Sequence, residues 1–139
     1  MDEFAPEQVV RRYYDALNTR DYAKAAGAFA ESCEFVSVPS GARFTGYTSV
    51  LNGLREFAAA FSDWRVEVER LVASGTDVVV EWRTTGTHDG EFRGALPTGI
   101  RFERRGCAVA EVGGGKIVRY RDYYDRATLL EQLGLIDAL

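Results

Sequence analysis

The residues best suited to chemistry lie near the end of the chain, in the run YRDYYD at positions 120–125. Glycines at 113–115 can form a tight turn before it, and the β-branched and aromatic residues that follow favour a strand. A strand points alternate side chains to opposite faces. One face would carry Val118, Tyr120, Asp122 and Tyr124, and the other Ile117, Arg119, Arg121, Tyr123 and Asp125. The first face is mostly apolar, so we expect Asp122 to point into the interior.

A carboxylate in apolar surroundings can serve as a general acid or base. Burial disfavours the charged form and raises the pKa toward a value useful for proton transfer. Because burying an unpartnered carboxylate is costly, Asp122 needs a reason for its position. We interpret Asp122 as the catalytic residue, with Asp125 as the second choice. The competing interpretation is a structural carboxylate that satisfies local donors or pairs with an arginine.

Arg104 bears on that choice. It shares a strand register with Ile100, Phe102, Ala108 and Ala110. On that face it could form an ion pair with Asp122 or orient a substrate carbonyl. A β-bulge near Gly106 would instead turn Arg104 outward, and the sequence leaves both arrangements open.

His88 is the single histidine of the chain and shares a register with Trp82. Imidazole titrates near neutral pH, so His88 could hydrogen-bond a substrate oxygen or assist Asp122 as a second catalytic residue. The alternative is a structural histidine that anchors the loop after its strand. Lone histidines outside a recognised triad favour the structural role.

Aromatic residues with polar edges are the candidate substrate contacts. Together with Arg104, they are Tyr13, Trp64, Trp82, Tyr120 and Tyr124. Aromatic side chains mostly fill protein cores, so packing is the competing role for each of them.

Composition limits the class of protein. The 139 residues are the size of one domain spanning 1–139, and 46% hydrophobic with 27% charged residues is ordinary for a globular chain. A net charge of −4 argues against a nucleic-acid-binding surface. No apolar run approaches the roughly 20 residues of a membrane span, and the acidic start is unlike a signal peptide, so we expect a cytoplasmic protein. Cys33 and Cys107 have no metal-type or redox spacing and are expected to be reduced thiols, and one histidine excludes a His-rich metal site.

Hydrophobic periodicity predicts the elements that must position these residues. Helices are expected at 6–18, at 21–29 with Asp21 as the cap, after Gly46, and at 127–133 with Gly134 as the C-cap. Strands are expected at 33–38 and at 43–45. Two further strands are expected, a half-buried one that begins at Trp64 and a longer one that ends at His88. The last two strands are expected at 100–112 and after the glycine turn. Helices segregate toward the start of the chain and strands follow consecutively, which indicates an α+β fold. Long antiparallel strands coil, so three N-terminal helices on the concave side would leave a cone with an apolar lining.

Several phrases of the sequence resemble a known family. They are VRRYYDALN at 10–18, GTHDGEFRG at 86–94, PTG at 97–99, GKI at 115–117, YRDYYD at 120–125 and LLEQLG at 129–134. With the order of elements, they resemble the NTF2-like (cystatin-like) superfamily of cone-shaped α+β folds, and within it the SnoaL-like polyketide and ester cyclases. The resemblance spans nearly the whole chain.

The resemblance implies a cofactor-free active site with no metal on the concave face of a curved, mixed, largely antiparallel sheet. In the family, an aspartate of the final strand moves a proton while a polyketide ester closes a ring by an intramolecular aldol reaction. Asp122 matches that aspartate. Conjugation in such a substrate would delocalise the enolate. The resemblance also implies a homodimer that pairs through the outer face of the sheet.

Relatives of the same fold suggest other activities. In ketosteroid isomerases a first-helix tyrosine, matching Tyr13, donates to the enolate, and an acidic base precedes a proline on an early strand. Here Ser37 and Val38 precede Pro39, so that base is missing. Limonene-type epoxide hydrolases combine the final-strand aspartate with an arginine and an aspartate on the long strand. Those two positions are Trp82 and Thr84 here.

Two functions from different classes are therefore open. The first is a cyclase-type enzyme acting on a small, apolar, oxygen-bearing substrate. The second is a non-catalytic module that binds an apolar ligand in the same cone. Epoxide hydrolase or ketosteroid isomerase activity comes third, because the residues each requires are incomplete.

Overall fold

The computed structural model describes residues 5–135 and consists of four helices and six strands. In chain order the elements are α1 (Pro6–Asn18), α2 (Tyr22–Ala26), β1 (Phe29–Ser37), β2 (Ala42–Thr45), α3 (Tyr47–Ala60), β3 (Arg65–Ser74), β4 (Asp77–Thr87), β5 (Arg101–Gly113), β6 (Lys116–Tyr124) and α4 (Arg126–Gln132). Helices and strands are segregated, so the α+β class is confirmed.

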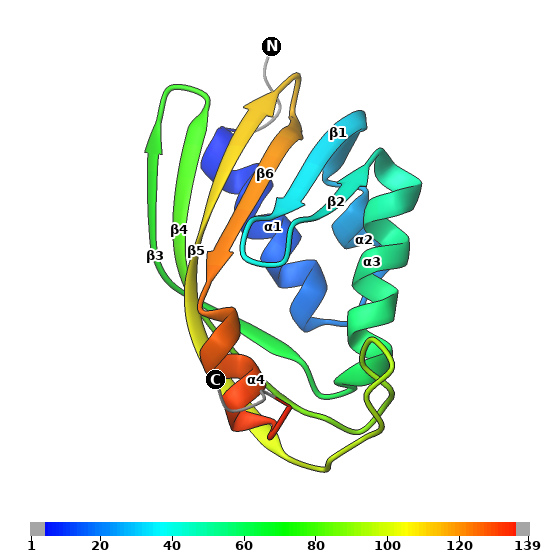
Figure 1. Cartoon of the computed structure of the whole chain (residues 1–139). Coiled ribbons are helices and arrows are strands. Elements are labelled where there is room, and N and C mark those ends of the chain that lie inside the picture. The colour runs from blue at the N-terminus through cyan, green and yellow to red at the C-terminus, as the bar shows by residue number, and fades with distance from the viewer. Residues whose placement is uncertain (1–4, 136–139) are drawn as a thin grey trace.

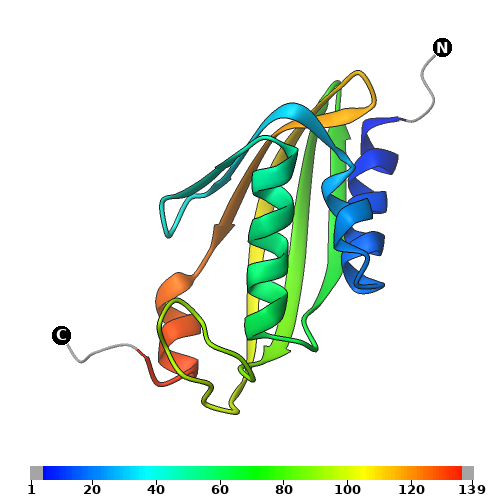
Figure 2. The same ribbon diagram turned by 90° about the vertical axis from the view of Figure 1, so that its right-hand side faces the viewer.

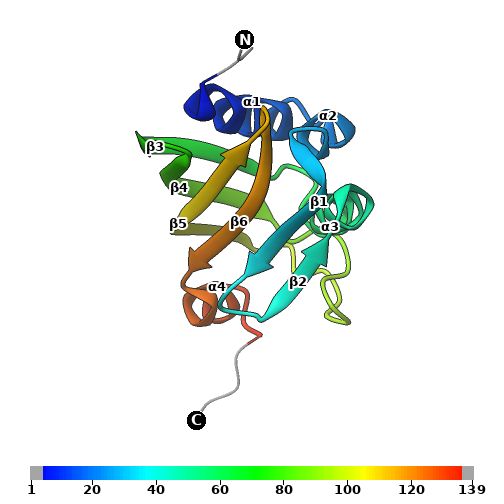
Figure 3. The same cartoon turned by 90° about the horizontal axis from the view of Figure 1, so that it is seen from above.

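The six strands form one curved sheet in the order β2-β1-β6-β5-β4-β3 (Figure 1). Strands β1 and β6 pair in parallel and every other neighbouring pair is antiparallel. The sheet curves around α1 and α3, which cover the same face (Figures 2 and 3). Helix α4 and the connection between β4 and β5 lie together at one end of the molecule (Figure 2). This arrangement is the cone expected of the NTF2-like fold.

Helix α1 presents a continuous buried stripe to the sheet. Its first residue is Pro6, which suits the first turn because proline lacks the N–H that would be unpaired there. Residues at helical spacing are buried: Val9, Val10, Tyr13, Tyr14, Ala16 and Leu17. The helix therefore delivers two tyrosine rings to the interior.

The second helix is shorter than expected. Asp21 caps it as predicted, accepting a hydrogen bond from the Lys24 backbone N–H at 3.0 Å, but it ends at Ala26 rather than near Phe29. Phe29 instead begins β1, whose parallel pairing with β6 starts when the Ile117 N–H donates to the carbonyl of Ala28 at 2.8 Å. Pairing with a strand far along the chain thus overrides the local helical preference of an alanine-rich segment.

The facing of β6 was predicted correctly except at its beginning. Ile117, expected on the solvent side, has a fully buried side chain. The register between β5 and β6 shifts between Glu111 and Val112, and this irregularity turns Ile117 inward. From Tyr120 onward the alternation holds, so Tyr120 is buried and Arg121 is exposed.

The β4–β5 pairing is regular along its length. It runs without a register shift from Asp77 opposite Glu111 to Thr87 opposite Arg101. There is consequently no bulge at Gly106, and Arg104 lies on the inner face. The inward residues predicted for β4 are buried: Val78, Val80, Trp82 and Thr84.

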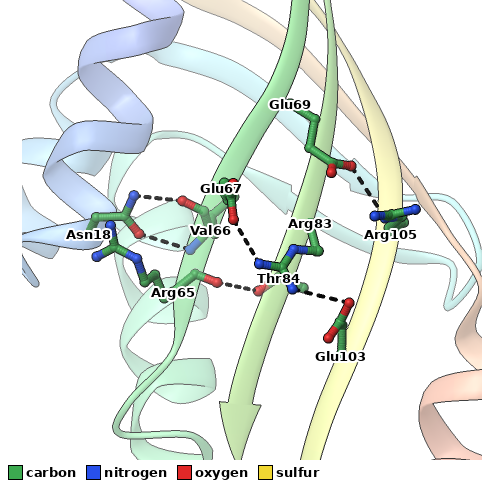
Figure 4. A network of polar contacts seen from close by, with 9 residues as sticks. All are labelled: Asn18, Arg65, Val66, Glu67, Glu69, Arg83, Thr84, Glu103 and Arg105. Atoms are coloured by element: carbon green, nitrogen blue, oxygen red, sulfur yellow. Dashed lines mark hydrogen bonds and ion pairs between the residues drawn. The ribbon is translucent and has the colours of Figure 1, made fainter.

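The outer face of β3, β4 and β5 carries charged pairs. Arg83 of β4 forms ion pairs with Glu67 of β3 at 2.8 Å and with Glu103 of β5 at 3.1 Å, and Arg105 pairs with Glu69 at 3.4 Å (Figure 4). These groups remain exposed, so each pair contributes little to stability. No helix within residues 5–135 has the length and apolar character needed to cross a membrane.

Candidate active site

Asp122 lies on β6 and points to the inner face of the sheet. Its Oδ1 accepts a hydrogen bond of 3.1 Å from the indole Nε1 of Trp82 on β4. Burial raises the pKa of Asp122 from 3.8 to about 6, although the positive charge of Arg104 and the Trp82 hydrogen bond act in the opposite direction. No residue in the described part of the chain hydrogen-bonds to Oδ2. One oxygen is thus held in place while the other is available to a ligand.

Gly106 allows Trp82 to reach Asp122. The glycine pairs with Trp82 on one side and with Tyr124 of β6 on the other, so the indole must pass over β5. A Cβ atom at position 106 would lie 2.5 Å from Cζ2 of Trp82 and 2.5 Å from the carbonyl oxygen of Tyr123. Only glycine leaves room for this crossing. Sequence reasoning noted Gly106 as a place for a bulge and missed this role.

Arg104 is surrounded by aromatic rings. Its guanidinium carbon lies 4.1 Å from the ring centre of Tyr124 and 5.5 to 5.7 Å from the rings of Phe57, Trp82 and Phe102. Burial lowers the pKa of Arg104, while Tyr124 and the negative charge of Asp122 oppose that change. Arg104 nevertheless forms no ion pair with Asp122, so the pairing considered from the sequence is absent between these two described residues.

Three tyrosines pack beside Asp122. The hydroxyls of Tyr14 and Tyr120 form a short hydrogen bond, and the ring of Tyr13 lies 5.5 Å from that of Tyr120. Burial raises the pKa of all three well above 10.0, and the negative charge of Asp122 raises each further. All three are therefore neutral hydrogen-bonding groups at physiological pH.

Asp122 opens onto a cavity of about 640 Å³. The cavity is bounded by α3, by the β4–β5 connection and by α4, with the sheet as its floor. Its apolar wall includes Phe35, Phe44, Val50, Leu54, Phe57, Trp64, Phe92 and Leu129. Its polar inner groups are Tyr13, Ser37, Arg104, Asp122 and Tyr124. A volume of this size is typical of small-molecule sites.

The predicted substrate contacts divide into two groups. Tyr13, Trp64, Arg104 and Tyr124 line the large cavity together with Asp122. Trp82 and Tyr120 instead border a smaller space of about 30 Å³ behind the carboxylate. Trp82 hydrogen-bonds to Asp122, and Tyr120 hydrogen-bonds to Tyr14.

Ser37 is a site residue that sequence reasoning missed. It lies opposite Asp122 in the parallel β1–β6 pairing, and its hydroxyl is 2.8 Å from that of Tyr124 and 2.8 Å from that of Ser40. This chain of hydroxyls orients the Tyr124 ring that stacks on Arg104. Its one signal in the sequence is its position shortly before Pro39, where ketosteroid isomerases carry an acidic base.

His88 lies outside the large cavity and is fully buried. Its Nδ1 accepts a hydrogen bond from the Thr98 backbone N–H at 3.3 Å and is 3.0 Å from the Thr98 hydroxyl. Thr98 lies at the far end of the β4–β5 connection. The geometry is that of the loop-anchoring role, and it does not bring His88 to Asp122.

Asp125 is separated from the cavity by its capping role. Its carboxylate accepts hydrogen bonds from the Thr128 backbone N–H at 2.9 Å and from the Thr128 hydroxyl at 2.6 Å. These bonds lower the pKa of the exposed Asp125. A carboxylate held ionised at a helix N-terminus is poorly suited to proton transfer, in contrast to Asp122.

Solved structures share this architecture. IdmH of Streptomyces antibioticus, a candidate polyketide cyclase, is 26% identical with a TM-score of 0.81, over 94% of this chain and 99% of that one. A candidate SnoaL-like polyketide cyclase from Jannaschia sp. CCS1 is 18% identical with a TM-score of 0.85, over 99% of both chains. An LEH-like epoxide hydrolase from M. tuberculosis is 22% identical with a TM-score of 0.74, over 92% of this chain and 88% of that one. A search of curated proteins found no match.

The family assignment comes from the sequence itself. The family model described as SnoaL-like polyketide cyclase matches residues 7–133, which include every element that forms the cavity. The fold agrees with the resemblance seen in the sequence. The chain belongs to the SnoaL-like polyketide cyclase family.

Proposed function

We propose that this protein is a cofactor-independent cyclase-type enzyme in which Asp122 is the general acid and base. The observation that carries the proposal is one inward carboxylate with a pKa of about 6, open to an apolar cavity of about 640 Å³. A base with a pKa near the working pH is both ionised and able to return its proton. The substrate class is an apolar, conjugated, polyketide-like molecule that carries carbonyl groups.

The proposed reaction is an intramolecular aldol-type ring closure. Oδ2 of ionised Asp122 removes a proton from a carbon next to a substrate carbonyl and leaves an enolate. The enolate carbon then bonds to a second carbonyl carbon of the same molecule, whose π electrons become an alkoxide. The alkoxide takes the proton back from Asp122. Every atom and charge is recovered without an external oxidant or reductant.

The cavity supports this chemistry in two ways. Its aromatic wall excludes water and holds a flexible substrate folded, which brings the two reacting carbons together. The neutral hydroxyl of Tyr13 lines the cavity and is available to donate to a carbonyl oxygen, since no described residue accepts from it. Trp82 keeps Oδ1 occupied, so the proton moves through Oδ2.

The structure gives less support to epoxide hydrolysis. Limonene-type epoxide hydrolases carry an arginine and an aspartate at two positions of the long strand. In this chain the residues at both positions are committed to other contacts. Trp82 bonds to Asp122, and Thr84 accepts from Nε1 of Trp64 at 2.9 Å while donating to the Arg65 carbonyl at 2.9 Å. Neither can supply the positive or negative charge that the reaction requires. A non-catalytic ligand-binding module remains the second candidate, favoured by the largely apolar lining.

A deuterium-exchange assay separates the two candidates without knowledge of the natural substrate. The probe is 2-acetylnaphthalene in D₂O, and mass spectrometry follows the loss of its methyl protons next to the carbonyl. An enzyme of the proposed type should speed the exchange above the buffer rate. Asp122→Asn should reduce that acceleration about 100-fold or more.

The matched control is Asp125→Asn, because asparagine caps helices as well as aspartate does. It should exchange the probe at the wild-type rate. Exchange by Asp122→Asn at the wild-type rate would refute the assignment of Asp122. Binding of the probe without any exchange by the wild type would favour the binding module.

A further inference from the structure

Nε of the buried Arg104 guanidinium lacks a hydrogen-bonding partner among the described residues. It is also inaccessible to solvent. The guanidinium has five N–H donors and is always charged, and leaving such a group unpaired in a protein interior is costly. Two outward-facing arginines of the same sheet are paired instead, Arg83 with Glu67 and Glu103, and Arg105 with Glu69.

The rings around Arg104 do not replace an acceptor. Tyr124, at 4.1 Å, lies in cation–π contact with the guanidinium, and Phe57, Trp82 and Phe102 surround it at 5.5 to 5.7 Å. Such contacts favour a cation but leave Nε without an acceptor, and the one side-chain hydrogen bond that acts on the pKa of Arg104 is to Tyr124. Arg104 also lines the large cavity. A ligand oxygen in the cavity would be the acceptor that the described residues do not supply to Nε.

Asp122 does not supply that oxygen. The two charges attract each other at a distance but form no ion pair, and Oδ1 is taken by Trp82. The other charged groups lining the cavity are Glu56, Glu91, Arg93 and Arg126, all with exposed side chains. Two of these groups are acidic and two are basic. Together they carry no net charge that could neutralise Arg104.

We propose that Arg104 binds an anionic group of the ligand, a planar oxyanion with two oxygens attached to an apolar body. A carboxylate and the enolate of a 1,3-dicarbonyl both have this shape, and a guanidinium fork matches it through two parallel hydrogen bonds. The inference deepens the proposed function, because it names the charge of the molecule that occupies the same cavity. Asp122 lines the same cavity, so the charge would lie in the space onto which Oδ2 opens.

Calorimetric titration with paired probes tests this proposal. The probes are 2-naphthoate and its neutral isostere 2-naphthamide, measured at pH 7.5. Wild-type protein should bind the acid about tenfold or more tightly than the amide, as expected for hydrogen bonds between charged groups. A third probe, 1-(2-naphthyl)butane-1,3-dione, measured below and above its own pKa, distinguishes a dicarbonyl enolate from a carboxylate as the preferred oxyanion.

Variants then assign the preference to one residue. Arg104→Met, of similar length and without charge, should lose the preference for the acid while binding the amide as the wild type does. Arg104→Lys should restore only part of it, because a lysine ammonium cannot form the planar fork. Arg105→Met is the matched control on the outer face and should leave both affinities unchanged.

Three results would overturn the inference. They are equal binding of acid and amide by the wild type, an equal loss of both in Arg104→Met, and failure of both probes to bind. Equal binding of acid and amide by the wild type needs no variant and would overturn the inference even if Arg104→Met does not fold, and Arg104→Lys then serves to assign a preference to this residue. Failure of the acid/base proposal would appear separately, as normal deuterium exchange by Asp122→Asn, which leaves Arg104 in place.

Discussion

The indole of Trp82 holds Oδ1 of Asp122 at 3.1 Å from its position two strands away. The hydrogen bond spans β5, and Gly106 of that strand leaves the space for it. This relationship gives the carboxylate two different oxygens. Oδ1 is fixed by a neutral donor, and Oδ2 is free to exchange a proton in the cavity.

The rate of the proposed reaction should depend on pH through Asp122. Its pKa is raised to about 6, so the ionised base accumulates as the pH rises through 6 and the rate should level off above it. The Trp82 hydrogen bond lowers that pKa, so Trp82→Phe, which keeps a ring but loses the donor, should move the midpoint upward. Initial rates of probe exchange between pH 4.5 and 8 provide the measurement. An unchanged midpoint in Trp82→Phe would contradict the role given to the hydrogen bond.

Asp122 should also reduce the stability of the protein at neutral pH. Its folded pKa of about 6 lies above the value of 3.8 for an unperturbed aspartate, so the folded state binds the extra proton between these values. The contribution to stability is complete below about pH 4 and is lost as the pH rises through 6. Asp122→Asn should therefore raise the melting temperature at pH 7.5 by a few degrees, on the order expected for 1 kcal/mol, and not at pH 4. A lower melting temperature at pH 7.5 would mean that the carboxylate stabilises the fold.

Gly106→Ala should displace Trp82. The new methyl group would meet both the indole and the backbone oxygen of Tyr123 at 2.5 Å, so the ring must move and the bond to Asp122 is lost. We expect a destabilisation of about 1–3 kcal/mol in urea unfolding and a change in tryptophan fluorescence. The control is Gly113→Ala, at the end of the same strand, where a Cβ meets its nearest neighbour at an ordinary 3.6 Å. Equal effects of both substitutions would show that Gly106 has no special role in this crossing.

Asp125 should matter for stability and not for proton transfer. Asp125→Ala removes the cap of α4 and should cost about 1 kcal/mol of unfolding free energy, whereas Asp125→Asn should cost little. Chemical denaturation of the two variants gives the comparison. Both should retain probe exchange, and a loss of exchange in Asp125→Asn would return Asp125 to the list of catalytic candidates.

The resemblance to the family predicts a homodimer through the outer face of the sheet. That face carries the charged pairs of Arg83 and Arg105 (Figure 4). It also carries the exposed side chains of Val79 and Tyr123. Pairing through charged groups weakens as salt screens them. Sedimentation equilibrium at micromolar concentration should therefore find a dimer whose affinity falls as salt rises. A monomer at every concentration up to 100 μM would contradict the prediction.

Local sequence patterns determined much of the fold. The stripe of α1, the capping aspartate of α2 and the alternation along β4 are properties of neighbouring residues, and each was read correctly because it depends on short-range geometry. The errors arose where distant segments pair. Phe29 joined a strand because β6 provided a partner, and Ile117 turned inward because the β5–β6 register shifts beside it.

The candidate site likewise combines features set by local sequence with contacts between distant segments. The alternation of β6 was sufficient to place Asp122 on the inner face, where desolvation acts to raise the pKa of an aspartate. Which partners it meets depended on the curvature of the sheet. Strand order brings Trp82 across Gly106, directs Arg104 into a group of rings and leaves His88 at the loop, and none of these long-range contacts is encoded in the spacing of residues along the chain.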